Sequence, residues 1–390
     1  MLVAQNRSVV RCVWAVFFVN GVVLSSWAPR IPEVARHLDL SDSELGAALF
    51  GVAAGSVPAL LLAGRILHRM EPARVCVVTA LVFSAALPLI GVAGGVWQLT
   101  AILMVLGAAS GVLDVAMNTL AITCQERSGR RVLSRMHGGY SLGVLAGAAG
   151  GVVAIRLGAT VALHLAIVAT VLAAIVLASA ITLWPHDHGD AGRQSVDTRA
   201  GSPTGRWGIP LTVAALAVCG LLVEGLITDW SALLISRDLG ASDTTAATAL
   251  AIFNLAMFIS RSIGDSVLSR FGEGRLLTTT AVSTAFLITV GLLIAQPLVM
   301  VLAIGLTGLA IGPIFPLAVQ AANRSTPGRA AAMTARVSAV GYIAYLGGPP
   351  LAGFVAEAVG LPAAFAVVTL VCSAGIAVAR RRPAQAMTER

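Results

Sequence analysis

The chain has 390 residues, of which 57% are apolar and only 11% are charged, and its mean hydropathy is +0.89. Soluble domains are about 25% charged, so this composition excludes an ordinary soluble protein and predicts an all-α protein that spans a membrane many times. The net charge of +8 comes from arginine alone, because lysine is absent. This absence excludes a P-loop nucleotide site and a lysine Schiff base. The arginines lie scattered between apolar segments, which does not favour a nucleic-acid partner.

Apolar stretches long enough to cross about 30 Å of hydrocarbon recur along the whole chain. They predict twelve transmembrane helices, near residues 10–29, 45–67, 73–94, 97–124, 136–157, 160–184, 209–233, 244–264, 275–295, 298–321, 333–357 and 361–380. The longest polar interval, rich in Gly, Asp, Arg and Ser, predicts a cytoplasmic linker over 185–208. It would join two six-helix bundles, 1–184 and 209–390.

The placement of arginine predicts the orientation of these helices. If the N-terminus is cytoplasmic, only Arg30, Arg36, Arg156 and Arg237 fall on the outer side, and all other arginines fall in cytoplasmic segments or at their edges. An excess of arginine in cytoplasmic loops is typical of inserted helices. We therefore expect a multi-pass protein of a bacterial-type inner membrane, with both termini in the cytoplasm.

The two halves resemble each other at an offset of 201 residues. Leu38, Leu40, Ser41 and Asp42 correspond to Leu239, Ala241, Ser242 and Asp243, which predicts a helix N-cap in each half. Residues 69–74 likewise correspond to 270–275. A parallel repeat of six helices is typical of transporters whose site lies at the interface of the repeats.

With this layout the chain resembles the major facilitator superfamily over essentially its whole length. Five strings are similar to the fucose-permease-like bacterial members: SWAPRIP (26–32), LDVAMN (113–118), HGGYSLG (137–143), EGLITDWS (224–231) and LGGPPLAG (346–353). The loop after the second span departs from the superfamily pattern, because His68 stands where an Asp is usual, between Gly64 and Arg69. The resemblance implies alternating access and proton-coupled uptake of a sugar or similar solute.

Asp114 is the leading candidate for proton coupling. It lies within an apolar span, where a carboxylate is costly unless it faces a partner or water. Asn118 lies one helical turn further on the same face and is a candidate for substrate binding. The structural alternatives are an ion pair for Asp114 and an interhelical hydrogen bond for Asn118.

Glu224 is the second candidate for proton coupling, near the middle of the seventh predicted span. Asp229 lies about 140° further round that helix, so the two carboxylates cannot face one point. We expect Asp229 to pair with Arg30 or Arg237, either as an outer gate or as a structural salt bridge.

Aromatic and amide residues in both halves are candidates for substrate contact. Asn20 and Trp27 share a stripe of the first span, and Trp230 has a position similar to Trp27 in the second half. The two tryptophans could stack on a sugar ring, or they could belong to the interfacial aromatic belt. Further candidates, by position in predicted spans, are Tyr140, Asn254, Phe315, Tyr342 and Tyr345.

Three residues near the cytoplasmic ends are candidates for gating. Arg261 and Asp265, four residues apart, are expected to form a helix-end pair. His137 begins the fifth predicted span and could relay a proton, or it could be an ordinary helix-end histidine. His164, in the sixth, is expected to be a satisfied interior histidine.

The sequence therefore predicts a proton-coupled transporter of a small polar solute, working as a monomer in a lipid bilayer. Proton-driven efflux of a drug or metabolite and a non-transporting receptor on the same fold are the alternatives. We expect no enzyme activity, metal or organic cofactor, with the proton gradient as energy source.

Overall fold

A computed structural model of the chain describes residues 2–128, 133–183, 209–325 and 330–380, and these ranges contain helices and short turns but no strand. Twelve helical segments among them are long and apolar enough to cross a membrane. This confirms the predicted all-α architecture with twelve spans. The predicted linker, 185–208, lies outside the described residues.

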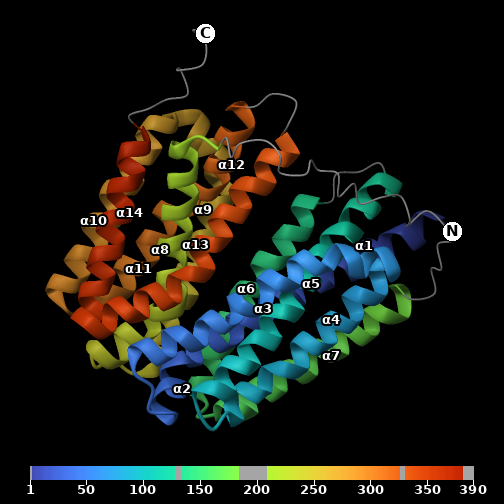
Figure 1. Ribbon diagram of the computed structural model, residues 1–390, viewed down its shortest axis with the longest axis horizontal. Helices are drawn as coiled ribbons and strands as arrows, with labels where there is room; N and C mark the ends of the chain where they lie inside the picture. Colours follow the sequence, from blue (N-terminus) through green and yellow to red (C-terminus); the bar gives the residue numbers. More distant parts are fainter. Residues whose placement is uncertain (1, 129–132, 184–208, 326–329, 381–390) are drawn as a thin grey trace. The chain divides into compact units, whose positions relative to one another are not determined.

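The helices of the first half follow one another in chain order, blue to green in Figure 1. They are α1 (Leu2–Trp27), the 3₁₀ turn η1 (Ala28–Arg30), α2 (Ile31–His37), α3 (Asp42–Arg69), α4 (Pro72–Ala86), the 3₁₀ turn η2 (Leu87–Val92), α5 (Val96–Ser128), α6 (Leu133–Arg156) and α7 (Val161–Leu183). The first span thus runs through α1, η1 and α2, further than predicted.

The helices of the second half run from yellow-green to red. They are α8 (Leu211–Leu233), the π-helical turn η4 (Leu234–Asp238), α9 (Asp243–Phe271), α10 (Glu273–Ile294), α11 (Pro297–Ile311), α12 (Ile314–Ser325), α13 (Ala330–Val359) and α14 (Leu361–Arg380). The predicted span over 298–321 is confirmed, and within it α11 and α12 are separated by Gly312 and Pro313. Proline has no N–H to continue the helical ladder.

Serine caps begin the corresponding helices of both halves, as the repeat predicted. Ser41 accepts a hydrogen bond from the backbone N–H of Glu44, and the Glu44 carboxylate accepts one from the backbone N–H of Ser41. This reciprocal pair is a capping box. Ser242 likewise accepts a hydrogen bond from the N–H of Thr245 at the start of α9.

Contacts divide the chain into two compact units, each described here by itself. The first consists of residues up to Leu40 and from Ala47 to Thr198, and the second of Ser41–Gly46 and the chain from Arg199 onward. The first turn of α3 therefore packs with the second unit, although sequence order places it in the first half.

Close helix packing in the first unit depends on glycine. A Cβ at Gly21 of α1 would overlap the carbonyl oxygen of Tyr140 in α6, and one at Gly143 would overlap the carbonyl of Phe18. Small residues let backbones approach in a membrane, where the hydrophobic effect does not drive helices together. α1 and α6 are held against each other in this way.

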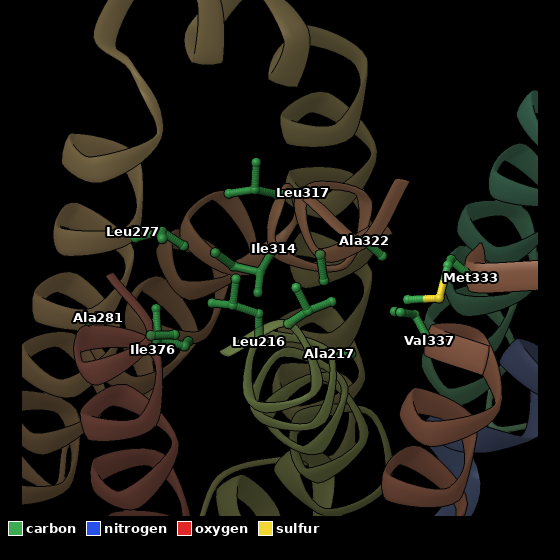
Figure 2. Packing of buried hydrophobic residues seen from close by; sticks show 13 residues of the cluster. Leu216, Ala217, Leu277, Ala281, Ile314, Leu317, Ala322, Met333, Val337 and Ile376 are labelled. Atoms are coloured by element: carbon green, nitrogen blue, oxygen red, sulfur yellow. The ribbon is translucent and has the colours of Figure 1, made fainter. Parts of the chain in front are cut away.

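The second unit is built around α8, which contacts α9, α11, α12, α13 and α14. Leu216 and Ala217 of α8 meet Ile314 and Leu317 of α12 in a buried cluster that also takes in side chains of α10, α13 and α14 (Figure 2). α10 and α14 lie side by side at its edge (Figure 1). This cluster fixes the start of α12 against the middle of the unit.

Large apolar side chains also cover the outside of the helices. Leu61, Trp97 and Leu293 are 77%, 83% and 80% exposed. Exposed apolar surface of this extent would be a liability in water, but lipid tails solvate it. The surface therefore agrees with a multi-pass membrane protein.

Candidate functional site

Asp114 lies in α5 as the sequence predicted, on one face with Asn118. The Asn118 side-chain amide donates to the backbone oxygen of Asp114 at 2.8 Å and to its carboxylate Oδ1 at 3.3 Å. Both side chains are half-buried. Within the described part of the first unit no cation contacts Asp114, so the predicted ion-pair alternative has no partner in that unit.

Asn20 brings α1 into the neighbourhood of this carboxylate. It is 6% exposed, and its amide nitrogen lies 3.7 Å from the sulfur of Met117, the residue before Asn118 in α5. A thioether is a weak acceptor, so this donor is poorly satisfied in the structure. The first unit thus places Asn20 of α1 against Met117, which lies between Asp114 and Asn118 in the sequence of α5.

The carboxylate of Glu224 in α8 forms a salt bridge with Arg261 of α9. Nη2 of Arg261 lies 2.7 Å from Glu224 Oε2, and Nε donates to the carbonyl oxygen of Gly312 at 3.3 Å. We expected Arg261 to pair with Asp265 along α9. The side chain of Asp265 lies outside the described residues. Arg261 reaches Glu224 because α9 packs against α8.

Prolines around the break between α11 and α12 leave carbonyl oxygens without helical donors. Arg261 binds one of them, Gly312 O, because Pro316 has no N–H to donate to it. Pro313 has no N–H for the oxygen of Leu309, and Ser260 of α9 donates to that oxygen at 2.6 Å. Thr280 of α10 donates to Ala310 O at 2.8 Å. Side chains of α9 and α10 thus satisfy three carbonyls at the end of α11, which helix ends in a membrane require. The Gly312-Pro313 pair was the sequence signal for this break.

Asp229 does not pair with Arg237, the proposed partner that lies in its own unit. Arg30 is 2% exposed and binds Glu33 at 2.6 Å. Arg237 binds both carboxylate oxygens of Asp42, at 2.5 and 3.1 Å. Within the described part of the second unit, no hydrogen-bond or ion-pair partner of Asp229 is found. The expected salt bridge of Asp229 with Arg237 is therefore wrong, because Arg237 is held by Asp42. The gating role of Asp229 stays a prediction.

His164 was expected to be an interior histidine with hydrogen-bonded ring nitrogens, and the structure confirms this for only one of the two nitrogens. Its Nδ1 accepts a hydrogen bond from Arg30 Nε at 3.4 Å, and Arg30 also donates to the carbonyl oxygen of Ala159. Its Nε2 is buried with no partner among the described residues. The cluster fastens η1 to the start of α7.

Neither tryptophan is open to a ligand. Trp27 is 4% exposed and Trp230 is fully buried, and the Trp230 Nε1 has no described hydrogen-bond partner. Gly353 leaves room for the Trp230 ring, because a Cβ there would lie 3.2 Å from it. This burial corrects the interfacial-belt interpretation, which needs a ring at the surface. The stacking role of the two tryptophans stays a prediction.

The remaining candidate site residues differ in their exposure and in the groups that they contact. His137 packs edge-on against Phe17, with ring centroids 5.4 Å apart, and Tyr140 is 38% exposed. Asn254 donates to Leu250 O of its own helix at 3.0 Å. Phe315 packs against the buried cluster, and Tyr345 lies against Gly225. The side chain of Tyr342 lies outside the described residues.

A cluster of three or more metal-ligating side chains is not found in the described ranges. The five cysteines are free thiols, and two of them, Cys219 in α8 and Cys372 in α14, lie close to each other. Their separation of more than a hundred residues gave no sequence signal for this contact.

Comparison with known proteins identifies the family. The profile of the Major Facilitator Superfamily matches residues 13–228 and 212–389. Membrane protein MosC of Rhizobium meliloti is 30% identical over 374 residues, covering 95% of this chain and 90% of that protein. An uncharacterised MFS-type transporter of Yersinia pestis is 29% identical over 361 residues, covering 91% and 90%.

Solved transporters share the fold. The nucleoside transporter NupG superposes with a TM-score of 0.72 at 13% identity, covering 97% of both chains. The D-xylose–proton symporter gives 0.68 at 14% identity over 95% and 96%. FucP in its outward conformation gives 0.60 at 17% identity over 95% and 97%. At these identities the likeness concerns the fold alone.

Proposed function

Because the chain belongs to the major facilitator superfamily, we propose that it is a proton-coupled secondary active transporter of a small polar solute, a sugar or related compound, that works by alternating access. It would act as a monomer in a bacterial-type inner membrane with both termini in the cytoplasm. The solved sugar and nucleoside transporters of the same fold support the solute class.

The observation that carries proton coupling is the environment of Asp114. Its only polar partner in the described part of the first unit is Asn118 of the same helix, and no cation described in that unit neutralises it. An ionised carboxylate without a counter-ion is destabilised in a low-dielectric medium, and a bound proton removes the charge. Asp114 would therefore be protonated when the transporter reorients and would release the proton when it meets water.

The amides beside Asp114 supply the means to bind the solute. Asn118 and Asn20 carry donors and acceptors that match hydroxyl groups, and Asn20 has only a weak acceptor in the structure. A solute hydroxyl would replace the sulfur of Met117 as partner of the Asn20 amide. Proton and solute would then occupy neighbouring positions on α5.

The test is internal pH in proteoliposomes while sugars and nucleosides are added outside. We expect solute-dependent acidification in the native protein and its loss in Asp114→Asn. Glu71→Gln is the matched control, because Glu71 lies between two spans and its exposed carboxylate pairs with Arg74. This control should transport normally.

Other outcomes would overturn the proposal. Alkalinisation on adding a cationic drug would indicate proton-driven efflux. Solute binding without any flux would indicate a receptor on the transporter fold. Equal proton flux in Asp114→Asn and the native protein would remove Asp114 from the coupling mechanism.

A further inference from the structure

The exposed face of α10 carries an apolar stripe that begins at an arginine. Arg275 is exposed in the first turn of α10, and Val282 and Phe286 are 62% and 63% exposed further along the helix. Residues spaced seven and four positions apart lie within about 40° of one another round a helix. The arginine and the two apolar side chains therefore share one face, which points away from the interior of the second unit.

A second arginine reaches the same end of α10 from α14. The two helices lie side by side (Figure 1), and Arg380 is the basic residue in the last turn of α14. Its Nε would lie 3.7 Å from a Cβ built at Gly274, the residue before Arg275. Two guanidinium groups from two helices thus border the first turn of α10, and we call Arg275 and Arg380 the arginine patch.

The charges of the arginine patch are not neutralised within the described part of the second unit. No described carboxylate there lies within salt-bridge distance of Arg275 or Arg380, and this includes Glu273 in the same turn of α10. The neighbouring Arg270 differs, because its guanidinium lies over the ring of Phe271 at 5.6 Å. The apolar stripe therefore ends in two exposed positive charges that are available to a partner.

We propose that this surface binds an anionic phospholipid of the surrounding membrane. Arg275 and Arg380 hold the phosphodiester of the headgroup, and an acyl chain lies along Val282 and Phe286. Arginine binds phosphate groups through paired charge-assisted hydrogen bonds, and basic residues at a membrane surface attract anionic lipids. The inference goes beyond the proposed function, because it does not depend on which solute is transported.

The dimensions of the surface match one lipid. From Arg275 to Phe286 the helix rises about 17 Å, close to half of a hydrocarbon core of about 30 Å. A lipid of one leaflet with its headgroup at the arginine patch would therefore cover the stripe as far as Phe286. An organic phosphate without acyl chains would leave the stripe unoccupied, so the geometry favours a lipid over a soluble anion.

The corresponding surface of the first unit lacks this arrangement. Arg74 stands 201 residues before Arg275, but its Nε lies 3.4 Å from a carboxylate oxygen of Glu71. α7, which precedes α14 by the same offset, has no basic residue in its last turn, and the buried Ser179 corresponds to Arg380. We therefore expect the lipid at the second unit only, and the first unit supplies a matched control.

Lipid binding is measured by native mass spectrometry of the full-length protein in detergent. The protein is titrated with dioleoyl phosphatidylglycerol or with dioleoyl phosphatidylcholine, which has the same chains but no net charge. Each arginine near a membrane surface should tighten the binding of an anionic lipid about 5-fold. The first phosphatidylglycerol should therefore bind roughly 25-fold more tightly than the first phosphatidylcholine.

Variants locate the headgroup. Arg275→Gln and Arg380→Gln should each weaken phosphatidylglycerol binding about 5-fold and leave phosphatidylcholine binding unchanged. Arg74→Gln removes the same charge at the corresponding position of the first unit and should bind phosphatidylglycerol as the native protein does. Equal affinity for the two lipids would overturn the inference, and so would an equal loss in Arg74→Gln and Arg275→Gln, which would indicate a diffuse attraction to positive charge.

A second measurement uses the native protein and does not depend on the folding of a variant. In proteoliposomes, phosphatidylglycerol with a photoactivatable diazirine on its acyl chain should label α10 more strongly than the analogous phosphatidylcholine does. The two lipids should label α4, the counterpart of α10, equally. Excess glycerol phosphate should not reduce the labelling of α10. Equal labelling of α10 by the two lipids, or its loss to glycerol phosphate, would contradict a lipid site at the arginine patch.

Discussion

The hydroxyl of Ser260 donates a hydrogen bond to the backbone oxygen of Leu309 at 2.6 Å, replacing the N–H that Pro313 lacks. Ser260 is 5% exposed, so water does not substitute for it readily. This contact closes the end of α11 and holds α9 beside the break in the tenth span. The Arg261 contact to Gly312 O lies next to it.

Ser260→Ala should destabilise the protein by about 1–3 kcal/mol, because a buried carbonyl loses its donor. In a Pro313→Ala background the loss should be smaller, since the alanine that replaces the proline supplies an N–H of its own. The measurement is thermal or chemical unfolding of all four members of the cycle. Ser262→Ala, on an exposed face of α9, should change stability by less than about 0.5 kcal/mol. Equal losses in both backgrounds would contradict the replacement.

Two glycines of α6 should respond in opposite ways to alanine. Gly143→Ala would place a Cβ against the Phe18 carbonyl of α1, at a cost of about 1–3 kcal/mol. A Cβ at Gly150 meets nothing within 4 Å, so Gly150→Ala should stabilise the helix by up to about 1 kcal/mol. Melting temperatures in one detergent compare the two directly. A similar loss at both positions would show that α1 and α6 do not pack as described.

The thiols of Cys219 and Cys372 should be linked by mild oxidation with copper phenanthroline, which removes two electrons and two protons from the pair. Their contact is tight, because Gly375 leaves space for the Cys219 sulfur. Mass spectrometry of the digested protein should find this disulfide and leave Cys76, which is fully buried, as a free thiol. Cys372→Ala is the control, and a disulfide of Cys219 with any other cysteine would contradict the packing of α8 on α14.

Arg30→Met should lower stability by about 2 kcal/mol or more, because His164 Nδ1 and the oxygen of Ala159 lose a charged donor inside the first unit. Thermal unfolding with circular dichroism measures this loss. Arg156→Met removes an exposed arginine at the end of α6 and should be nearly neutral. If Arg30→Met and Arg156→Met have the same melting temperature, the cluster around Arg30 does not stabilise the unit.

The local features of this protein could be predicted from its sequence. The twelve spans follow from the length of the apolar stretches, because lipid requires about 20 residues of helix for each crossing. The serine caps and the shared face of Asp114 and Asn118 depend on residues within four positions of each other. Such contacts are fixed by helix geometry alone.

Only the tertiary structure decided which charges meet and which aromatic rings are covered. Glu224 and Arg261 are 37 residues apart, and Arg30 and His164 are 134 apart, so their contacts depend on how helices pack. The sequence placed Arg261 with Asp265 because only neighbours along one helix can be paired without a packing arrangement. The burial of Trp27 and Trp230 also depends on packing, because neighbouring helices cover the two rings. Hydropathy along the chain does not show which helices are neighbours.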